Sequence, residues 1–279
     1  MVNNKIKVLF VILVTSLVIG CSQLVGLGGK DFTVEEVIDQ SIQKMAQEKG
    51  ASYEIKGEQG VKVEASDKKI QRNDTFTMRM DLVQQPFAMH INGEIKSDGK
   101  PRPIDIYLVN ETLFQKSYDG TWIKSEGIST DSLAGQIHKP DAPLEQLKHV
   151  LESLSDAQKE SLITMKERED AYQLEVVVTE KEEPTMNEIF QEQLKAALGP
   201  HLSQLGFPID MDSMKLIKWK QVIWIEKESF TQKKVEQKLQ VEMPVNSRPM
   251  KIEQKMVQTY VGPYTQRISV PEEVENSAK

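Results

Sequence analysis

The sequence predicts an α+β protein in which helices cover one antiparallel β-sheet, because this packing lets each apolar helical stripe meet the apolar face of a sheet. The first observation behind this prediction is a set of long stretches in which apolar and polar residues alternate, as in half-buried antiparallel strands. The second is a helical periodicity before and between these stretches. No Pro/Gly/Ser-rich linker divides residues 31–271, which are therefore expected to form a single domain.

The first helix is expected to begin after Thr33. Thr33 and Glu36 have the spacing of a capping box, in which the hydroxyl and the carboxylate each accept a hydrogen bond from a free backbone N–H. Apolar residues then recur at helical spacing, and Gly50 provides a C-terminal stop. The apolar stripe consists of Val34, Val37, Ile38, Ile42, Met45 and Ala46.

Strand periodicity follows over residues 52–126 and predicts about six half-buried antiparallel strands. Hairpin turns are expected at Asn110-Glu111 and at Asp119-Gly120, so residues 104–124 are interpreted as three short strands. The clearest alternation with polar neighbours is at Met78, Met80, Leu82, Met89, Ile91 and Ile95.

Helical periodicity returns in the middle of the chain. Ser155 and Gln158 have the spacing that caps a second short helix, residues 172–178 alternate as a strand, and residues 185–198 are helical again. The first apolar stripe of this region consists of Leu144, Leu147, Val150, Leu151 and Leu154.

The last part of the chain is rich in strand patterns. Four strands are expected, within residues 216–226, 235–243, 250–260 and 264–270. Residues 272–279 form a polar tail that is expected to fray, since chain ends are poorly ordered unless they are tied down.

The N-terminus has the pattern of an export signal. Lys5 and Lys7 precede an apolar run over residues 8–19, which is shorter than the about 17–25 residues that a spanning helix needs. The run ends at Val18-Ile19-Gly20-Cys21, which resembles the lipobox of bacterial lipoproteins, whose cysteine is alkylated with diacylglycerol before cleavage. The alternative is an ordinary signal peptide followed by a chance cysteine.

The lipobox interpretation gives the chain an expected location and organisation. Residues 1–20 are expected to be a lipoprotein signal peptide and residues 21–30, with three glycines, a flexible tether. Cys21 is the only cysteine, so a structural disulfide within the chain is excluded. Acyl chains on Cys21 are expected to anchor the body at the extracytoplasmic face of the cell membrane.

Charge and motifs argue against several function classes. The formal net charge of −7 does not suit nucleic acid, whose phosphates need a surplus of Lys and Arg. None of the histidines has zinc-ligand spacing, and no nucleotide-binding or nucleophile-elbow motif occurs. The chain is therefore expected to need no metal or cofactor and not to be an enzyme. The four histidines are His90, His138, His149 and His201.

Several short sequence segments resemble those of a known group of proteins. They are the lipobox, the opening amphipathic helix, the hairpins from Tyr107 to Lys124, the strand Trp224-Ile225-Glu226 and the closing phrase 270–274. Together they resemble a family of Gram-positive lipoproteins related to the LolA/LppX/LprG fold. The resemblance implies a curved antiparallel half-barrel with helices packed on its concave face. It further implies that the space between sheet and helices holds acyl chains or another apolar ligand.

Methionine is the residue type in this chain that fits such a ligand. It is not a preferred strand residue, and its flexible, polarisable side chain adapts to variable apolar shapes. Six methionines on predicted strands are candidate ligand-binding residues, and the alternative is that they are ordinary core fillers beneath the helices: Met78, Met80, Met89, Met243, Met250 and Met256.

Two functional hypotheses follow from these observations. The first is a non-catalytic lipoprotein that binds an apolar or acylated envelope ligand for carriage or sensing. The second is an envelope lipoprotein with a solid core that interacts with another protein and has no small-molecule ligand. A cavity lined by the six methionines would favour the first hypothesis, and side chains filling that space would favour the second.

Overall fold

The computed structural model describes most of the body of the chain. The residues predicted to be the signal peptide and the tether, Cys21 included, lie outside the described residues. The described segments are residues 32–64, 69–117, 119–127, 142–152, 154–179, 187–192, 194–195, 210, 212–245 and 248–278.

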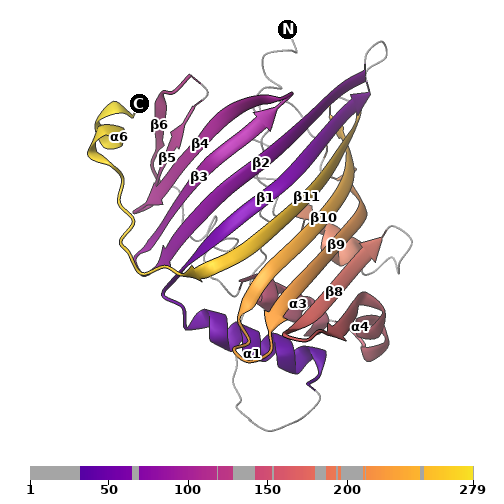
Figure 1. Ribbon diagram of the computed structural model, residues 1–279. Coiled ribbons are helices and arrows are strands. Elements are labelled where there is room, and N and C mark those ends of the chain that lie inside the picture. The colour runs from indigo at the N-terminus through magenta and orange to yellow at the C-terminus, as the bar shows by residue number, and fades with distance from the viewer. Residues whose placement is uncertain are drawn as a thin grey trace.

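One eleven-stranded antiparallel sheet forms the framework, which confirms the predicted sheet (Figure 1). The first six strands run as a meander from one edge to β1, the last five run from β11 to the other edge, and β1 pairs with β11 in the middle. The strands are β1 (Gly50–Glu64), β2 (Lys69–Gln84), β3 (Phe87–Ser97), β4 (Lys100–Val109), β5 (Thr112–Lys116), β6 (Trp122–Ser125), β7 (Ile163–Glu167), β8 (Ala171–Thr179), β9 (Lys215–Glu226), β10 (Gln232–Val245) and β11 (Arg248–Pro263).

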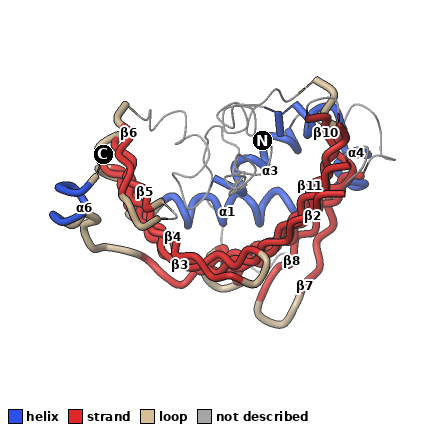
Figure 2. Tube along the Cα trace, turned by 90° about the horizontal axis from the view of Figure 1, so that it is seen from above, coloured by secondary structure: helices blue, strands red, loops and turns tan. Residues whose placement is uncertain are grey.

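The sheet is open and curved, and Figure 2 shows it as a trough. Two of the helices, α1 (Val34–Ala46) and α3 (Ala142–Glu152), lie within the curve, whereas α6 (Glu272–Ser277) lies outside it beside β5 and β6. A short helix, α4 (Asp156–Leu162), leads directly into β7. We call the face of the sheet that meets α1 and α3 the concave face and the opposite face the convex face.

Side chains alternate between the two faces along each strand, as the sequence predicted. Along β11, every second residue from Met250 to Met256 is buried, while the residues between them are exposed or half-buried. Ion pairs join neighbouring strands across the convex face, where such pairs help to fix register but each contributes only about 0–1 kcal/mol. They include Lys255–Glu58, Lys251–Glu242 and Lys220–Glu175.

Helix α1 begins as the sequence predicts. The backbone N–H of Thr33 donates to Glu36 Oε2 at 2.9 Å, and the N–H of Glu36 donates to Thr33 Oγ1 at 3.2 Å, so both halves of the capping box are present. The buried side of the helix faces the sheet and consists of Val37, Ile38, Ser41 and Met45.

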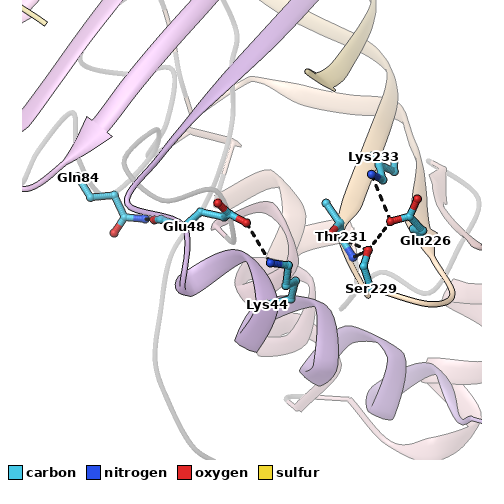
Figure 3. A network of polar contacts seen from close by, with 7 residues as sticks. All are labelled: Lys44, Glu48, Gln84, Glu226, Ser229, Thr231 and Lys233. Carbon is cyan, nitrogen blue, oxygen red and sulfur yellow. Dashed lines mark hydrogen bonds and ion pairs between the residues drawn. The ribbon is translucent and has the colours of Figure 1, made fainter. Parts of the chain in front are cut away.

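Polar contacts hold the C-terminal end of α1 against the sheet (Figure 3). Lys44 Nζ lies 3.1 Å from Glu48 Oε1, and the side-chain amide of Gln84, at the end of β2, donates to the backbone oxygen of Glu48 at 2.8 Å. The second bond joins residues 36 positions apart in the sequence. It fixes the helix at one end of the central strands.

The N-terminal end of α1 is held by aromatic packing against the β9–β10 turn. The ring of Phe32 lies 5.3 Å from that of Phe230, which is part of the turn. Figure 3 shows how the turn is closed: the Ser229 hydroxyl donates to the Glu226 carboxylate, which also lies 3.2 Å from Lys233 Nζ. Both ends of α1 are therefore tied to the sheet.

The C-terminal region differs from the prediction. Residues 264–270 are not a strand, because β11 already pairs with β1 and β10 on its two sides and leaves no free partner there. Residues 272–277 are not a frayed tail but helix α6, in which Val274 is buried against Phe114 and Trp122 on the convex face. This apolar contact ties down an otherwise polar segment.

Candidate functional site

The concave face carries an apolar cluster made only of strand residues. It lies on β1 to β4 and β11, and none of its members belongs to a described helix. Four of the six candidate methionines belong to it, so we call it the methionine cluster. Its buried members are Ala51, Tyr53, Ile55, Phe76, Met78, Met80, Leu82, Met89, Ile91, Ile95, Leu108 and Met256.

A second apolar cluster on the same face is covered by helices, and we call it the helix-covered cluster. Val37 and Ile38 of α1 and Leu147 of α3 pack there against residues of β7 to β11 such as Leu174 and Ile223. This half of the concave face has the arrangement expected of an ordinary core beneath helices.

The structure does not bring the six candidate methionines into one group. Met243 and Met250, which pair with each other across β10 and β11, belong to the helix-covered cluster. The other four belong to the methionine cluster, and one of them, Met256, lies between two buried glutamines on β11. All six are buried, with exposed fractions of 2–6 %.

Five buried glutamines lie on the concave face of β1, β9, β10 and β11, where the two apolar clusters meet, and we call them the glutamine belt. Gln59 on β1 pairs with Gln254 on β11, and Gln237 on β10 pairs with Gln221 on β9. Gln258 lies one step along β11 from Met256 on the same face. Each of the five is at most 9 % exposed.

The sequence contains a signal for this belt that was missed. The glutamines occupy positions of the strand alternation at which apolar residues are expected, as Gln254 does between Ile252 and Met256. Glutamine is mostly an exposed residue, so its recurrence on the buried face of adjacent strands is unusual.

An ion pair extends the belt onto β2 and β3. Asp74, which is opposite both Gln59 and Ser97 in the strand registers, is 1 % exposed. Its carboxylate accepts hydrogen bonds of 2.8 and 2.9 Å from Arg72 Nε, and Arg72 Nη2 donates to Ser97 Oγ at 3.0 Å. The acid is thus neutralised within the protein.

In Gln59, neither the side-chain nitrogen nor the side-chain oxygen has a hydrogen-bond partner among the described residues. The residue is 2 % exposed. Leaving a buried donor or acceptor unsatisfied costs about 1–3 kcal/mol. The Gln59 amide is therefore a place where a molecule that both donates and accepts hydrogen bonds would be stabilised.

Two tyrosines lie beside Gln258 in the methionine cluster: Tyr260 follows Gln258 on the same face of β11, and Tyr53 is paired with Tyr260 across β1. The rings of Tyr53 and Tyr260 meet edge to face at 5.8 Å. Burial raises the pKa of Tyr260 to about 12, and the nearby carboxylate of Glu48 acts in the same direction. Both effects disfavour the charged phenolate of Tyr260.

A cavity of about 300 Å³ lies elsewhere, between the β4–β6 edge and the C-terminal segment. None of the six methionines lines it. Val270 and Glu275 form its outer wall, and the sheet contributes Val109, Asn110, Thr112, Phe114 and Lys124.

The described residues show no constellation that suits a metal. They contain no group of three or more His, Cys, Asp or Glu side chains arranged to hold an ion. His90 Nε2 lies 2.9 Å from Asp105, and its ring stacks on Tyr107 at 4.1 Å on the convex face. His138 and His201 lie outside the described residues. Within the same part of the chain, no helix has the length and apolarity needed to cross a bilayer.

A family model described as a family of unknown function (DUF6612) matches residues 33–279. No curated protein matches the sequence.

Three solved structures with some similarity have low scores. A LolA superfamily protein (NE2245) from Nitrosomonas europaea is 8% identical, with 87% of this chain and 97% of that chain covered and a TM-score of 0.20. A DUF1329 family protein from Desulfovibrio piger is 9% identical, with 83% and 95% covered and a TM-score of 0.25. Lipovitellin, from a study of its lipid–protein interactions, is 8% identical, with 81% and 26% covered and a TM-score of 0.29. At these values none of them establishes a function for this chain.

Proposed function

The chain belongs to DUF6612, a family of unknown function, and we propose that it is a lipoprotein that binds an apolar or acylated envelope ligand, for carriage or sensing, without catalysing a reaction. It is anchored through Cys21 at the extracytoplasmic face of the cell membrane. Its sheet is a half-barrel of the LolA/LppX/LprG kind, with the ligand on the concave face.

The observation that carries this proposal is the methionine cluster. It is a continuous, buried apolar cluster on the concave face to which no described helix contributes, and four of its members are methionines. Such side chains adapt to flexible apolar partners. An acyl chain that buries about twelve methylenes there would gain about 10 kcal/mol before ordering costs.

Ligand binding is testable with an uncharged probe, a methyl palmitate analogue that carries a terminal diazirine. After irradiation, we expect cross-links in peptides from β2, β3 and β11, which hold the methionine cluster. Met80→Gln should lower the yield several-fold, because it places an amide against the acyl chain. Met243→Gln is the matched control: Met243 is as buried as Met80 but belongs to the helix-covered cluster. Equal losses in both variants, or cross-links confined to the convex face, would contradict the proposal.

Anchoring is testable with Cys21→Ser. The hydroxyl is a much weaker nucleophile than the thiol, so the variant should not be alkylated and fatty-acid labelling of the protein should fall to background. Labelling in growing cells, followed by membrane fractionation, measures the effect, and Ser22→Ala is the neighbouring control. Labelling of Cys21→Ser at the wild-type level would refute the lipobox assignment.

A protein-interaction role is the second candidate. Two observations favour it: the candidate methionines are at most 6 % exposed, and the described 300 Å³ cavity is on the other side of the sheet. Native mass spectrometry of the Cys21→Ser chain after exposure to a lipid extract separates the two candidates. A lipid-bound mass supports carriage or sensing, whereas an apo mass at every lipid concentration supports the interaction role.

A further inference from the structure

We propose that the glutamine belt selects the head group of the ligand, and that this head group is uncharged and both donates and accepts hydrogen bonds, as a hydroxyl or a primary amide does. This inference rests on the proposed function, because the acyl chain would lie on the methionine cluster next to the belt. The ligand class is therefore a neutral amphiphile, such as a monoacylglycerol or a fatty amide.

The position of the head group follows from the two unsatisfied atoms of Gln59. Its amide nitrogen can only donate and its amide oxygen can only accept, and both are buried without a partner among the described residues. A head group that offers only acceptors would leave the oxygen unpaired. A hydroxyl or an amide satisfies both atoms.

The absence of charge in the head group follows from the neighbouring ion pair. Asp74 is the buried acid nearest to Gln59 in the register, and its carboxylate is already bonded to Arg72. A carboxylate or ammonium head group would have to be desolvated beside this pair with no free counter-charge provided by it. The amides of the belt favour a neutral polar group instead.

The chain direction follows from the order of residues on the strands. Along β1, Ile55 of the methionine cluster lies on the same face as Gln59, and the position between them, Gly57, is covered by the ring of Phe76, another member of the cluster. Along β11, Gln254 is next to Met256 on the same face. A head group at Gln59 thus places the first methylenes directly on the methionine cluster.

Five ligands with the same palmitoyl or hexadecyl chain test this inference on the Cys21→Ser full chain. They are 1-monopalmitoylglycerol, palmitamide, methyl palmitate, palmitate and hexadecyltrimethylammonium, each measured by competition against the diazirine probe. We expect the first two to bind about tenfold or more tightly than methyl palmitate, which can only accept hydrogen bonds. The two charged ligands should bind more weakly than either. Comparison of the first two distinguishes a hydroxyl from an amide head group.

A variant of Gln59 assigns the preference to this residue. In Gln59→Met, which keeps the side-chain length, the preference for 1-monopalmitoylglycerol over methyl palmitate should fall to about twofold or less. Gln71→Met on the exposed convex face of β2 is the matched control and should keep the preference. Thermal unfolding of each variant checks that it is folded, and the wild-type ranking tests the inference independently of either variant.

The outcomes separate this inference from the proposed function. If none of the five ligands competes and the probe itself does not bind, both fail. If all five bind with similar affinity, if a charged ligand binds most tightly, or if Gln59→Met keeps the full preference, the belt does not select the head group, while apolar binding stands.

Discussion

Replacing Gly93 by alanine is expected to lower the free energy of unfolding by about 3–5 kcal/mol, through backbone strain and overpacking together. Gly93 lies in the middle of β3 at a φ of +153°, which L side chains rarely adopt. A Cβ there would lie 2.2 Å from the backbone oxygen of Thr77 and 2.7 Å from Met78 Cα. Because both contacts are with the backbone of β2, no rotamer change can relieve them. Urea unfolding followed by circular dichroism measures the loss.

Gly99→Ala is the control for this prediction. Gly99 also has a positive φ, +77°, but no atom lies within 4 Å of the position of a Cβ. Alanine there should cost only the conformational part, about 1–2 kcal/mol. Equal losses at the two positions would mean that the close approach of β2 and β3 at Gly93 does not constrain the sheet.

Local patterns in the sequence predicted most of the framework. The Thr33 capping box, the alternation along β2, β3, β10 and β11, and the turns at Asn110-Glu111 and Asp119-Gly120 each depend on residues close in the sequence. These elements can therefore be predicted from the spacing of residues along the sequence.

Features that depend on distant partners were mispredicted or missed. The alternation in residues 264–270 could not reveal that β11 has no unpaired side, and the polar composition of α6 hid the burial of Val274 against Trp122. Strand β7 follows α4 without a break, so its five residues gave no separate signal. Each of these features depends on which segments are neighbours in the folded sheet, and the pattern of residues along the sequence does not give that order.

For the candidate site, the sequence predicted only the type of residue, methionine, and not how the residues are grouped. Methionines on strands were recognised, but their division between two clusters depends on the register of β10 and β11, which places Met243 opposite Met250 and Gln237 opposite Met256. The belt can be recognised only once the strand pairing is known, because Gln59 and Gln254, which are far apart in the sequence, pair across β1 and β11. A glutamine in one strand is unremarkable, whereas aligned buried glutamines form a polar surface.

Replacing Asp74 by alanine is expected to lower the free energy of unfolding by about 3–5 kcal/mol, because it leaves the Arg72 guanidinium without its carboxylate partner on a buried face. Asp74 is 1 % exposed and the Arg72 side chain 14 %. The measurement is again urea unfolding. The double variant Arg72→Met/Asp74→Leu, which removes both charges and keeps apolar volume, should recover most of the lost stability.

Glu54→Ala is the matched control for Asp74→Ala. Glu54 and Lys56 also lie two residues apart on one strand, with Oε2 and Nζ 3.3 Å apart, but on the convex face with side chains 53 % and 63 % exposed. Water screens this pair, so its loss should cost only about 0.5 kcal/mol. A much larger loss of stability in Asp74→Ala than in Glu54→Ala would show that the concave face beside the belt is shielded from water. Such shielding is the condition under which an unpaired Gln59 amide can discriminate between head groups. Equal, small losses would mean that water reaches this part of β2, and a donor–acceptor head group would then gain nothing over an apolar one.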